Sequence, residues 1–311
     1  MLSQISQHLR QKLKLFFLTD NLILNNKVIP VSSENFQELK PSAEKTIAFV
    51  DGGQAEILSG GNLCLSFIRV FAQVMQGAKK LESFKEEFYL LTTAVYRQGE
   101  IWYESKIFGS DLIAEEDLII SSQDAAIKSG QERGPISKVT NMARRLAELK
   151  LASCIKADYI LLDGTLESTF QSEEKYLQNL GKNVGALAKT CSLFTTCGNS
   201  PVVLLQKLSP TQNSWSYFVE ENNYFVKLNY KAKHVFRFQG NKEILSVLLP
   251  HSSDPLFLGY PYGLILADKM ARVSNAEKNA LKMSLLLREE NRELVGYLNT
   301  LNAHEILDNL G

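Results

Sequence analysis

The chain has 311 residues, of which 45% are hydrophobic and 22% are charged. This composition is typical of a globular protein with a sizeable core, and the length suits one large domain or two medium ones. Its 34 basic and 34 acidic side chains cancel, so the overall charge does not mark a nucleic-acid-binding protein, and any basic surface must be local. The cysteines form no CxxC pair, which argues against a zinc site and a disulfide framework and favours a reducing cytoplasm (Cys64, Cys154, Cys191 and Cys197).

The N-terminal segment, residues 1–18, predicts a short amphipathic helix. Lys12 and Lys14 interrupt its apolar run and no small-residue cleavage site follows, so we expect no signal peptide. No apolar stretch reaches the length needed to span a membrane. Residues 19–45 predict a polar connecting stretch.

Two apolar strands run directly into Asp-Gly. Residues 46–50 lead into Asp51 and Gly52, and residues 159–162 lead into Asp163 and Gly164. A buried strand that ends on an aspartate points the carboxylate out of the sheet edge, and the glycine permits a sharp turn or the close approach of a ligand. Either pair alone is a common surface turn, but two carboxylates on neighbouring strands would suit a hard divalent cation.

The rest of the pattern predicts an α/β protein. In chain order we expect strands over 62–76 and 87–96, a charged excursion over 109–135, a helix over 136–155 with Ser137 as its cap, the strand before Asp163, a polar helix over 172–180, a strand over 183–188 ending at Lys189, two or three strands over 217–238, and helices over 263–273 and from 275 to near 310. This is the ribonuclease H-like order, a mixed sheet flanked by helices, with added N- and C-terminal helices. We divide the chain into an N-terminal helix and connecting stretch over 1–45, a central α/β domain over 46–275, and a C-terminal helical extension over 276–311.

Two further acids would meet the aspartates at one end of such a sheet. Glu148 lies off the apolar stripe of its predicted helix, although an ordinary i−4 pair with Arg144 is the simpler interpretation. Asp268 lies in a predicted helix that follows Pro261, among small and apolar neighbours. Its simpler interpretation is a helix-surface aspartate paired with a basic neighbour.

Together these segments resemble the NurA nuclease family, over residues 45–275. The resemblance is carried by strand-Asp51-Gly, Arg144-Arg145-Leu146-Ala147-Glu148, Leu162-Asp163-Gly164-Thr165-Leu166, Val184-Gly185-Ala186-Leu187-Ala188-Lys189-Thr190, and Gly259-Tyr260-Pro261…Ala267-Asp268. It implies a ribonuclease H-like, manganese-dependent DNA nuclease that forms homodimers and works with a hexameric HerA-type ATPase at DNA ends. The metal-site set that it implies is Asp51, Glu148, Asp163 and Asp268, with Tyr260 nearby. Archaeal members carry a histidine where this chain has Asp268. This difference leaves the preference for manganese or magnesium open.

The predicted reaction is hydrolysis of a DNA phosphodiester with two divalent ions about 3.5–4 Å apart. Asp51, on the central strand, is the best candidate to bridge them. Lys189 could offset charge on the scissile phosphate, or be an ordinary solvated lysine. Tyr260 could stack on a base or bind a phosphate, or only pack.

One segment suggests a nucleic-acid contact. Basic and aromatic residues interleave over residues 227–238, as on single-strand-binding surfaces, although a β-hairpin with a solvated lysine face fits equally well.

Two other functions remain open. Asp-Gly-Gly and Asp-Gly-Thr resemble phosphate loops of actin-like ATPases and sugar kinases, in which Asp51 and Asp163 would hold magnesium–ATP. A non-catalytic adaptor of a DNA-processing complex is the other alternative.

The C-terminal leucines predict an assembly surface. They recur at roughly helical spacing (Leu281, Leu285, Leu294, Leu298 and Leu301). We expect the first half of this helix to pack on the chain's own sheet. For the part beyond Arg288 we expect contact with a second copy or with that copy's N-terminal helix over 2–17.

Overall fold

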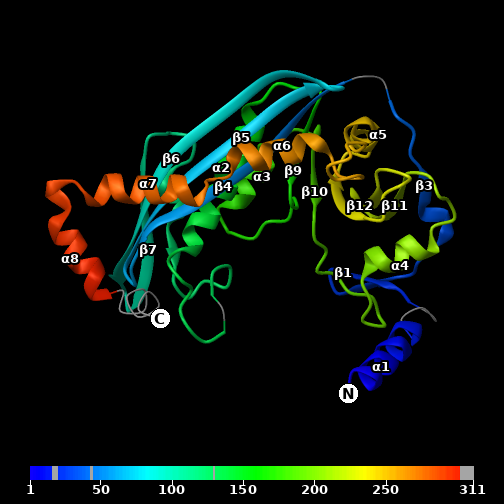
Figure 1. Ribbon diagram of the computed structural model, residues 1–311, viewed down its shortest axis with the longest axis horizontal. Helices are drawn as coiled ribbons and strands as arrows, with labels where there is room; N and C mark the ends of the chain where they lie inside the picture. Colours follow the sequence, from blue (N-terminus) through cyan, green and yellow to red (C-terminus); the bar gives the residue numbers. More distant parts are fainter. Residues whose placement is uncertain (16–19, 43–44, 129, 302–311) are drawn as a thin grey trace.

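The computed structural model describes residues 1–15, 20–42, 45–128 and 130–301 (Figure 1). The strands are β1 (Leu22–Leu24), β2 (Lys27–Ile29), β3 (Phe36–Glu38), β4 (Thr46–Ser59), β5 (Leu63–Gln76), β6 (Lys79–Arg97), β7 (Glu100–Phe108), β8 (Ile120–Ser121), β9 (Tyr159–Asp163), β10 (Val184–Ala188), β11 (Trp215–Glu220), β12 (Asn223–Lys227) and β13 (Phe236–Gly240). The α-helices are α1 (Leu2–Leu15), α2 (Lys138–Cys154), α3 (Glu173–Gln178), α4 (Pro201–Leu208), α5 (Glu243–His251), α6 (Tyr262–Ala271), α7 (Asn275–Leu286) and α8 (Arg292–Leu301). Short 3₁₀ helices are η1 (Ser33–Asn35), η2 (Glu115–Leu118) and η3 (Glu289–Asn291).

One large mixed sheet organises the molecule. Its strand order is β3-β11-β12-β13-β10-β9-β4-β5-β6-β7-β8. β4, β9 and β10 pair in parallel, whereas β4 to β7 form an antiparallel meander of long strands. The central order β6-β5-β4-β9-β10 confirms the expected ribonuclease H-like mixed sheet, because the meander precedes the parallel crossovers through α2 and α3.

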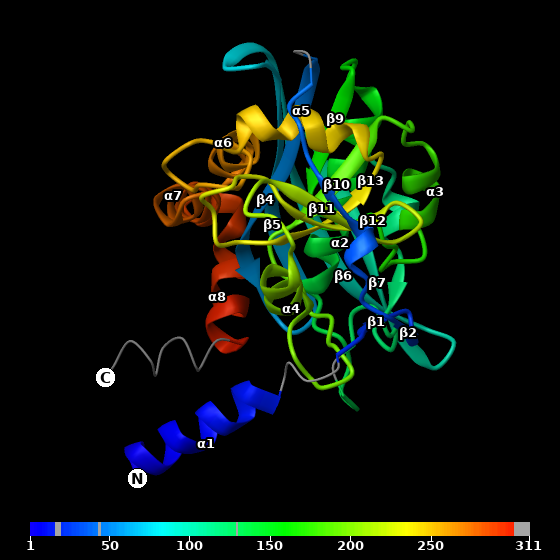
Figure 2. The ribbon, with the colours of Figure 1, turned by 90° about the vertical axis from the view of Figure 1, so that its right-hand side faces the viewer.

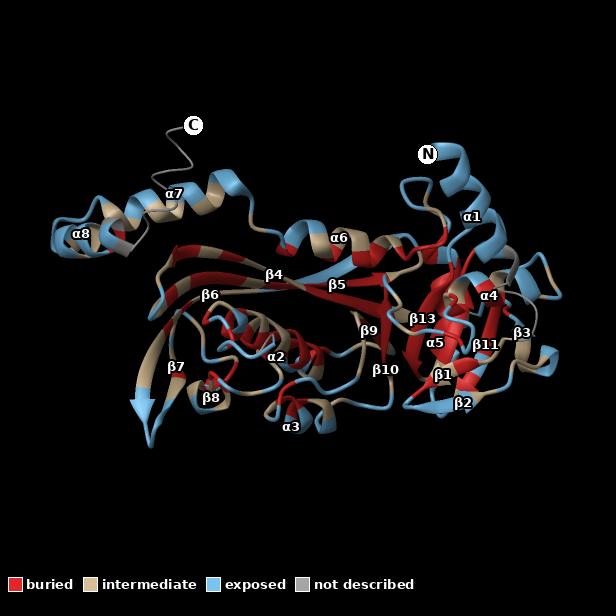
Figure 3. Cartoon of the chain, turned by 90° about the horizontal axis from the view of Figure 1, so that it is seen from below, coloured by how far each residue is buried: buried red, intermediate tan, exposed pale blue. Residues whose placement is uncertain are grey.

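Helices cover both faces of the central strands (Figure 3). Alternation along β4 sends Ala48 and Val50 into the core beneath α2, and Ile47 and Phe49 into the core beneath α5 and α6. A Cβ added to Gly263 of α6 would lie 2.0 Å from a ring carbon of Phe49, so the glycine allows α6 to lie directly on β4. β4, which carries Asp51, is therefore held in position by packed helices on both of its faces.

The N-terminal part holds more structure than the sequence pattern predicts. α1 confirms the predicted N-terminal helix, but residues 19–45 are not only a connection. β1 and β2 form a hairpin, and β3 pairs with β11 at the edge of the sheet. The sequence analysis also left β7, α4 and α5 unassigned. Of these, α4 has only eight residues, and α5 carries Pro250 in its last turn.

The C-terminal extension is two helices and not the single one predicted. The backbone becomes extended at Arg288, and the Asn291 side chain donates a hydrogen bond to the carbonyl of Leu285, which satisfies the end of α7. The turn lets leucines of both helices reach one apolar strip on β4 and β5, and Leu298 is buried there. The expectation that the stripe beyond Arg288 faces another copy is therefore wrong for Leu298. The side chain of Leu301 and residues 302–311 lie outside the described part.

Among the described helices, none combines the length and the apolar character needed to cross a bilayer.

Candidate active site

Asp51 lies where the parallel neighbour of its strand stops. The last residue pair between β4 and β9 joins Val50 to Leu162, one residue before Asp51. β4 itself continues to Ser59 in its pairing with β5, so the prediction that this strand ends on Asp51 is wrong. The carboxylate is nevertheless presented at the end of the parallel part of the sheet, as the ribonuclease H-like arrangement requires.

Gly52 and Gly53 serve close packing and not a turn, since neither has a positive φ. A Cβ on Gly52 would lie 2.5 Å from Glu148 Oε1, and a Cβ on Gly53 would lie 2.1 Å from the carbonyl oxygen of Ala271. The expected close approach to this Asp-Gly-Gly segment is therefore made by α2 and by the end of α6.

Asp163 ends β9 as predicted, and Gly164 turns the chain at a φ of +105°. Asp163 Oδ2 lies 2.6 Å from Lys189 Nζ, and its Oδ1 accepts a hydrogen bond of 3.2 Å from the Tyr260 hydroxyl. Three elements that are distant in the sequence thus meet at one carboxylate.

Glu148 is buried on the side of α2 that faces Gly52. Its Oε1 lies 2.5 Å from Arg144 Nη1, and its Oε2 lies 3.9 Å from Arg145 Nη1. The i−4 pair with Arg144 is thus present, yet the glutamate also lies at the candidate site. Ser137 begins α2 without a side-chain cap bond, contrary to the prediction.

The carboxylates influence one another. Burial, followed by the negative charges of Glu148 and Asp163, raises the pKa of Asp51 to about 7. Burial also raises the pKa of Glu148, although Arg144 and Arg145 oppose this. Buried carboxylates with raised pKa values, such as Asp51 and Glu148, are a common feature of functional sites.

Lys189 and Tyr260 complete the group around Asp163. Burial lowers the pKa of Lys189, but its hydrogen bond and charge attraction to Asp163 outweigh this, and the pKa is raised. Its ammonium lies 5.5 Å from the centre of the Tyr260 ring. Burial, followed by the charge of Asp163, raises the pKa of Tyr260 far above its ordinary value, so this phenol stays protonated and donates to the carboxylate.

Asp268 has a different partner from these acids. It projects from α6, is partly exposed, and pairs with Arg272 at 2.6 Å, which is the simpler interpretation considered from the sequence. Its charge contributes to the raised pKa of Lys189 and Tyr260, but it does not line the cleft described next.

A cleft of about 670 Å³ opens onto Asp51, Glu148 and Asp163. It also contains basic residues, one of which belongs to the segment 227–238 that the sequence analysis interpreted as either a nucleic-acid contact or a solvated β-hairpin. Arg237 is buried on β13 and forms an ion pair with Glu167. Its signal in the sequence is the alternation Phe236-Arg237-Phe238, which sends the two rings to one face and the guanidinium to the other.

Arg145 is a second residue whose role the sequence analysis missed. Its Nη2 donates to the carbonyl of Thr165 at 2.5 Å, and its Nε donates to Glu173 at 2.7 Å. Arg145 therefore fastens the loop after Asp163 to α2 and α3. Its only signal in the sequence is its place beside Arg144 in the motif that ends on Glu148.

The donor chemistry of the cleft fits a hard divalent cation, since three carboxylates converge on it. Their oxygens are, however, engaged by Lys189, Tyr260 and Arg144. The described residues contain no group of three or more His, Cys, Asp or Glu side chains arranged so that they could hold a metal ion. A cation would have to displace the lysine, the tyrosine and the arginine from the carboxylates.

The fold is similar to that of a known nuclease. The NurA nuclease from Sulfolobus solfataricus superposes with a TM-score of 0.51 at 14% identity, over 92% of each chain. Endonuclease V from Ciona intestinalis gives a TM-score of 0.39 at 10% identity, over 86% of this chain and 96% of that one. The human Endonuclease V catalytic domain gives 0.37 at 10% identity, over 92% and 99%. No family model and no curated protein sequence matches the chain. The likeness to NurA confirms the expected fold.

Proposed function

We propose that this protein is a divalent-metal-dependent deoxyribonuclease that hydrolyses phosphodiester bonds at DNA ends. The observation that carries the proposal is the convergence of Asp51, Glu148 and Asp163 on one cleft with basic residues among them. Carboxylates suit a metal, and Lys189 and Arg237 suit a phosphate, so the cleft combines the two chemistries that phosphodiester hydrolysis requires.

Manganese is the proposed metal, with magnesium as the alternative. Asp51, Glu148 and Asp163 would hold it, and it would activate water and neutralise charge on the phosphate. Lys189 and Arg144, which pair with carboxylates in the structure, would become available to the phosphate oxygens. Tyr260 would keep Asp163 oriented through its hydrogen bond, and Asp268 would act on the site through its charge alone.

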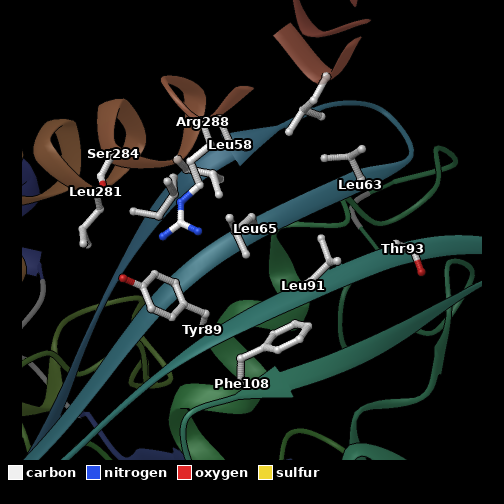
Figure 4. A pocket seen from close by; sticks show the side chains of 13 residues that line it. Leu58, Leu63, Leu65, Tyr89, Leu91, Thr93, Phe108, Leu281, Ser284 and Arg288 are labelled. Carbon is white, nitrogen blue, oxygen red and sulfur yellow. The ribbon is translucent and has the colours of Figure 1, made fainter. Parts of the chain in front are cut away.

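We further propose that the protein is a cytoplasmic homodimer that cooperates with a HerA-like hexameric ATPase in DNA repair. An apolar groove of about 780 Å³ lies between α7, α8 and the meander, and Arg288 projects across it (Figure 4). α1 extends away from the body (Figure 2), and residues 1–13 are all exposed. The sequence of α1 is basic and contains no acids, so it would suit the glutamates of η3 and of the first turn of α8 in a second copy, Glu289, Glu290 and Glu293.

A non-catalytic adaptor is the second candidate. The observation that favours it is the engagement of the acidic oxygens by basic side chains, without a three-ligand group among the described residues.

One assay separates the two candidates. Purified protein is incubated with linear single-stranded and duplex DNA in Mn²⁺, Mg²⁺ or EDTA, and compared with Asp51→Ala and with Asp111→Ala, an exposed aspartate outside the cleft. Metal-dependent cleavage that Asp51→Ala abolishes and Asp111→Ala retains supports the nuclease. Absence of cleavage with either metal favours the adaptor, and nucleotide binding without cleavage would favour the actin-like alternative.

A further inference from the structure

We propose that two neighbouring surface loops form a stacking platform for the unpaired bases of a single DNA strand and guide it to the cleft. The platform consists of residues 229–234, between β12 and β13, and residues 252–258, after α5. This inference rests on the proposed function and names the form of nucleic acid that the site accepts.

Only part of the basic and aromatic segment seen in the sequence faces solvent. Lys227 and Arg237 are buried, as are Phe236 and Phe238. Tyr230 is 57% exposed, and Lys231, Lys233 and His234 are exposed beside it. The solvated face is therefore the loop and not the strands.

The second loop extends this surface with further apolar area. Leu256 is 70% exposed and Phe257 is 41% exposed. The Phe257 ring stacks on His234, with ring centres 5.0 Å apart and an interplanar angle of 29°. An exposed aromatic pair of this kind offers a flat face to a base.

The platform leads to the carboxylates. Phe257 meets the ring of Tyr260 edge-on at 5.9 Å, and the Tyr260 hydroxyl bonds to Asp163. A base on His234 or Phe257 would therefore belong to the same strand as a phosphate near Lys189.

The two loops are held in place before any strand binds. Asn229 is buried, and its Nδ2 donates to the Ser252 carbonyl at 3.4 Å and to Ser253 Oγ at 3.3 Å. A Cβ on Gly259 would lie 2.5 Å from Ala232 Cβ, so the chain segments are in direct contact. Such fixed loops lose little conformational freedom on binding.

The charge of the platform favours a nucleic acid over a protein partner. It contains Lys231 and Lys233, and the Lys231 ammonium lies 5.4 Å from the Tyr230 ring centre. Asp254 is its one acid, and the Asp254 carboxylate accepts a hydrogen bond from the Leu256 amide. Stacking requires a free base face, which a duplex offers only at its ends, so the platform selects single strands.

The test measures binding in EDTA, where a metal-dependent nuclease leaves the probe intact. Fluorescence anisotropy follows a labelled single strand of about 20 nucleotides, longer than the sites of about 4–16 nucleotides that single-strand-binding folds cover, and a blunt duplex of the same sequence. The variants are Tyr230→Ala and Phe257→Ala, with Tyr96→Ala as the control because Tyr96 is also an exposed aromatic residue, near the end of β6.

We expect each platform variant to weaken single-strand binding about ten-fold and to leave duplex binding within about two-fold. Phe257→Trp should restore binding, because indole also stacks. In Lys231→Ala/Lys233→Ala the slope of log K against log[salt] should become shallower by about 1.4, which corresponds to the loss of two phosphate contacts on a single strand. Lys79→Ala/Lys80→Ala should leave this slope unchanged. Tyr230 lies at an exposed loop, so its variant remains informative if Phe257→Ala disturbs Tyr260.

Two results separate this inference from the proposed function. Metal-dependent cleavage by a protein whose Tyr230 and Phe257 variants bind single strands as tightly as the Tyr96 control would overturn the platform alone. Single-strand binding that depends on these rings in a protein that cleaves no DNA would support the platform and overturn the nuclease. Equal losses on strand and duplex would also contradict the platform.

Discussion

Ionisation of the Asp51 carboxyl group is expected to lower the stability of the folded protein. Its pKa of about 7 in the folded protein exceeds the ordinary value of 3.8, so the stabilisation from its neutral form is complete below about pH 4 and is lost as the pH rises through 7. Asp51→Asn removes this charge while keeping the shape. In EDTA at about pH 8, the variant should be more stable than wild type by up to about 4 kcal/mol.

Thermal melts of the two proteins between about pH 4 and pH 8 test this expectation. The stabilities should converge in acid and separate toward neutral pH. If the two profiles stay parallel across this range, Asp51 is not the buried, repelled carboxylate that the geometry indicates. The same variant should lack metal-dependent cleavage, since an amide is a weaker ligand than a carboxylate.

Gly52 is expected to position Glu148. In Gly52→Ala the new Cβ would overlap Glu148 Oε1, at 2.5 Å, and Arg144 Cγ, at 2.9 Å, and would push the glutamate out of its place. Displacing a supporting residue of this kind typically costs about 10–100-fold in metal affinity or activity. Titration with Mn²⁺, followed by the paramagnetic signal of the free ion, measures the affinity directly. Gly61→Ala is the matched control, because nothing lies within 4 Å of that position.

At the scale of elements, α6 determines what Asp268 can do. Gly263, near the start of this helix, packs directly against the Phe49 ring, and the carbonyl of Ala271, at its end, packs directly against Gly53. The helix cannot move toward the cleft without losing one of these contacts. Asp268→Ala should therefore retain activity within about ten-fold of wild type, whereas loss of Asp51 abolishes it.

Asp268→His should lose activity to the same modest extent with manganese and with magnesium, because a residue that acts through its charge alone does not contact either ion. Initial cleavage rates with each metal, compared with those of Arg272→Ala, decide whether Asp268 acts through charge. Complete inactivity of Asp268→Ala with both metals would restore Asp268 as a ligand.

The sequence carried the order of the elements because each central element has a local signal. The run from Tyr159 to Asp163 ends on a glycine that adopts a positive φ, and α2 has an uninterrupted apolar stripe. The continuation of β4 beyond Asp51 could not be predicted. A pair of glycines is equally compatible with a turn and with the close approach of Glu148 and Ala271 that the structure shows.

The contrast between local sequence signals and tertiary packing also explains which residues of the candidate site could be predicted. The two strand-Asp-Gly runs predicted Asp51 and Asp163, the resemblance to NurA implied Glu148, and the structure brings the three to one cleft. Asp268 was included by its place in a motif, but its pairing with Arg272 depends on the direction in which α6 presents it. Arg237 was missed because its role depends on tertiary packing against Glu167.

At the scale of the whole molecule, α1 stands out because its residues up to Leu13 are all exposed. Ile5 and Leu9 are one helical turn apart and are 48% and 56% exposed. In Ile5→Glu/Leu9→Glu we expect the proposed homodimer to dissociate, seen as a halved mass in light scattering. The melting temperature of the monomer should not fall, because neither side chain is part of a core.

Val28→Glu supplies the control for that experiment, since Val28 is equally exposed on β2 and should leave the mass unchanged. A double variant that keeps the mass of the wild-type dimer would eliminate α1 as the contact. A wild-type protein of monomeric mass would contradict the homodimer itself.

The parallel pairing of β4 with β9 has a consequence for the order of folding. The hairpins of β4 to β7 join segments that are adjacent in the sequence, whereas Ile47 finds Tyr159 only after more than a hundred intervening residues have been synthesised. Contacts of such long range form slowly, because the loop between them must first close. Asp51 belongs to the early hairpins and Asp163 to the late strand. The cleft is therefore complete only after this long-range pairing has formed, and a nascent chain that has not yet reached β9 presents Asp51 without Asp163.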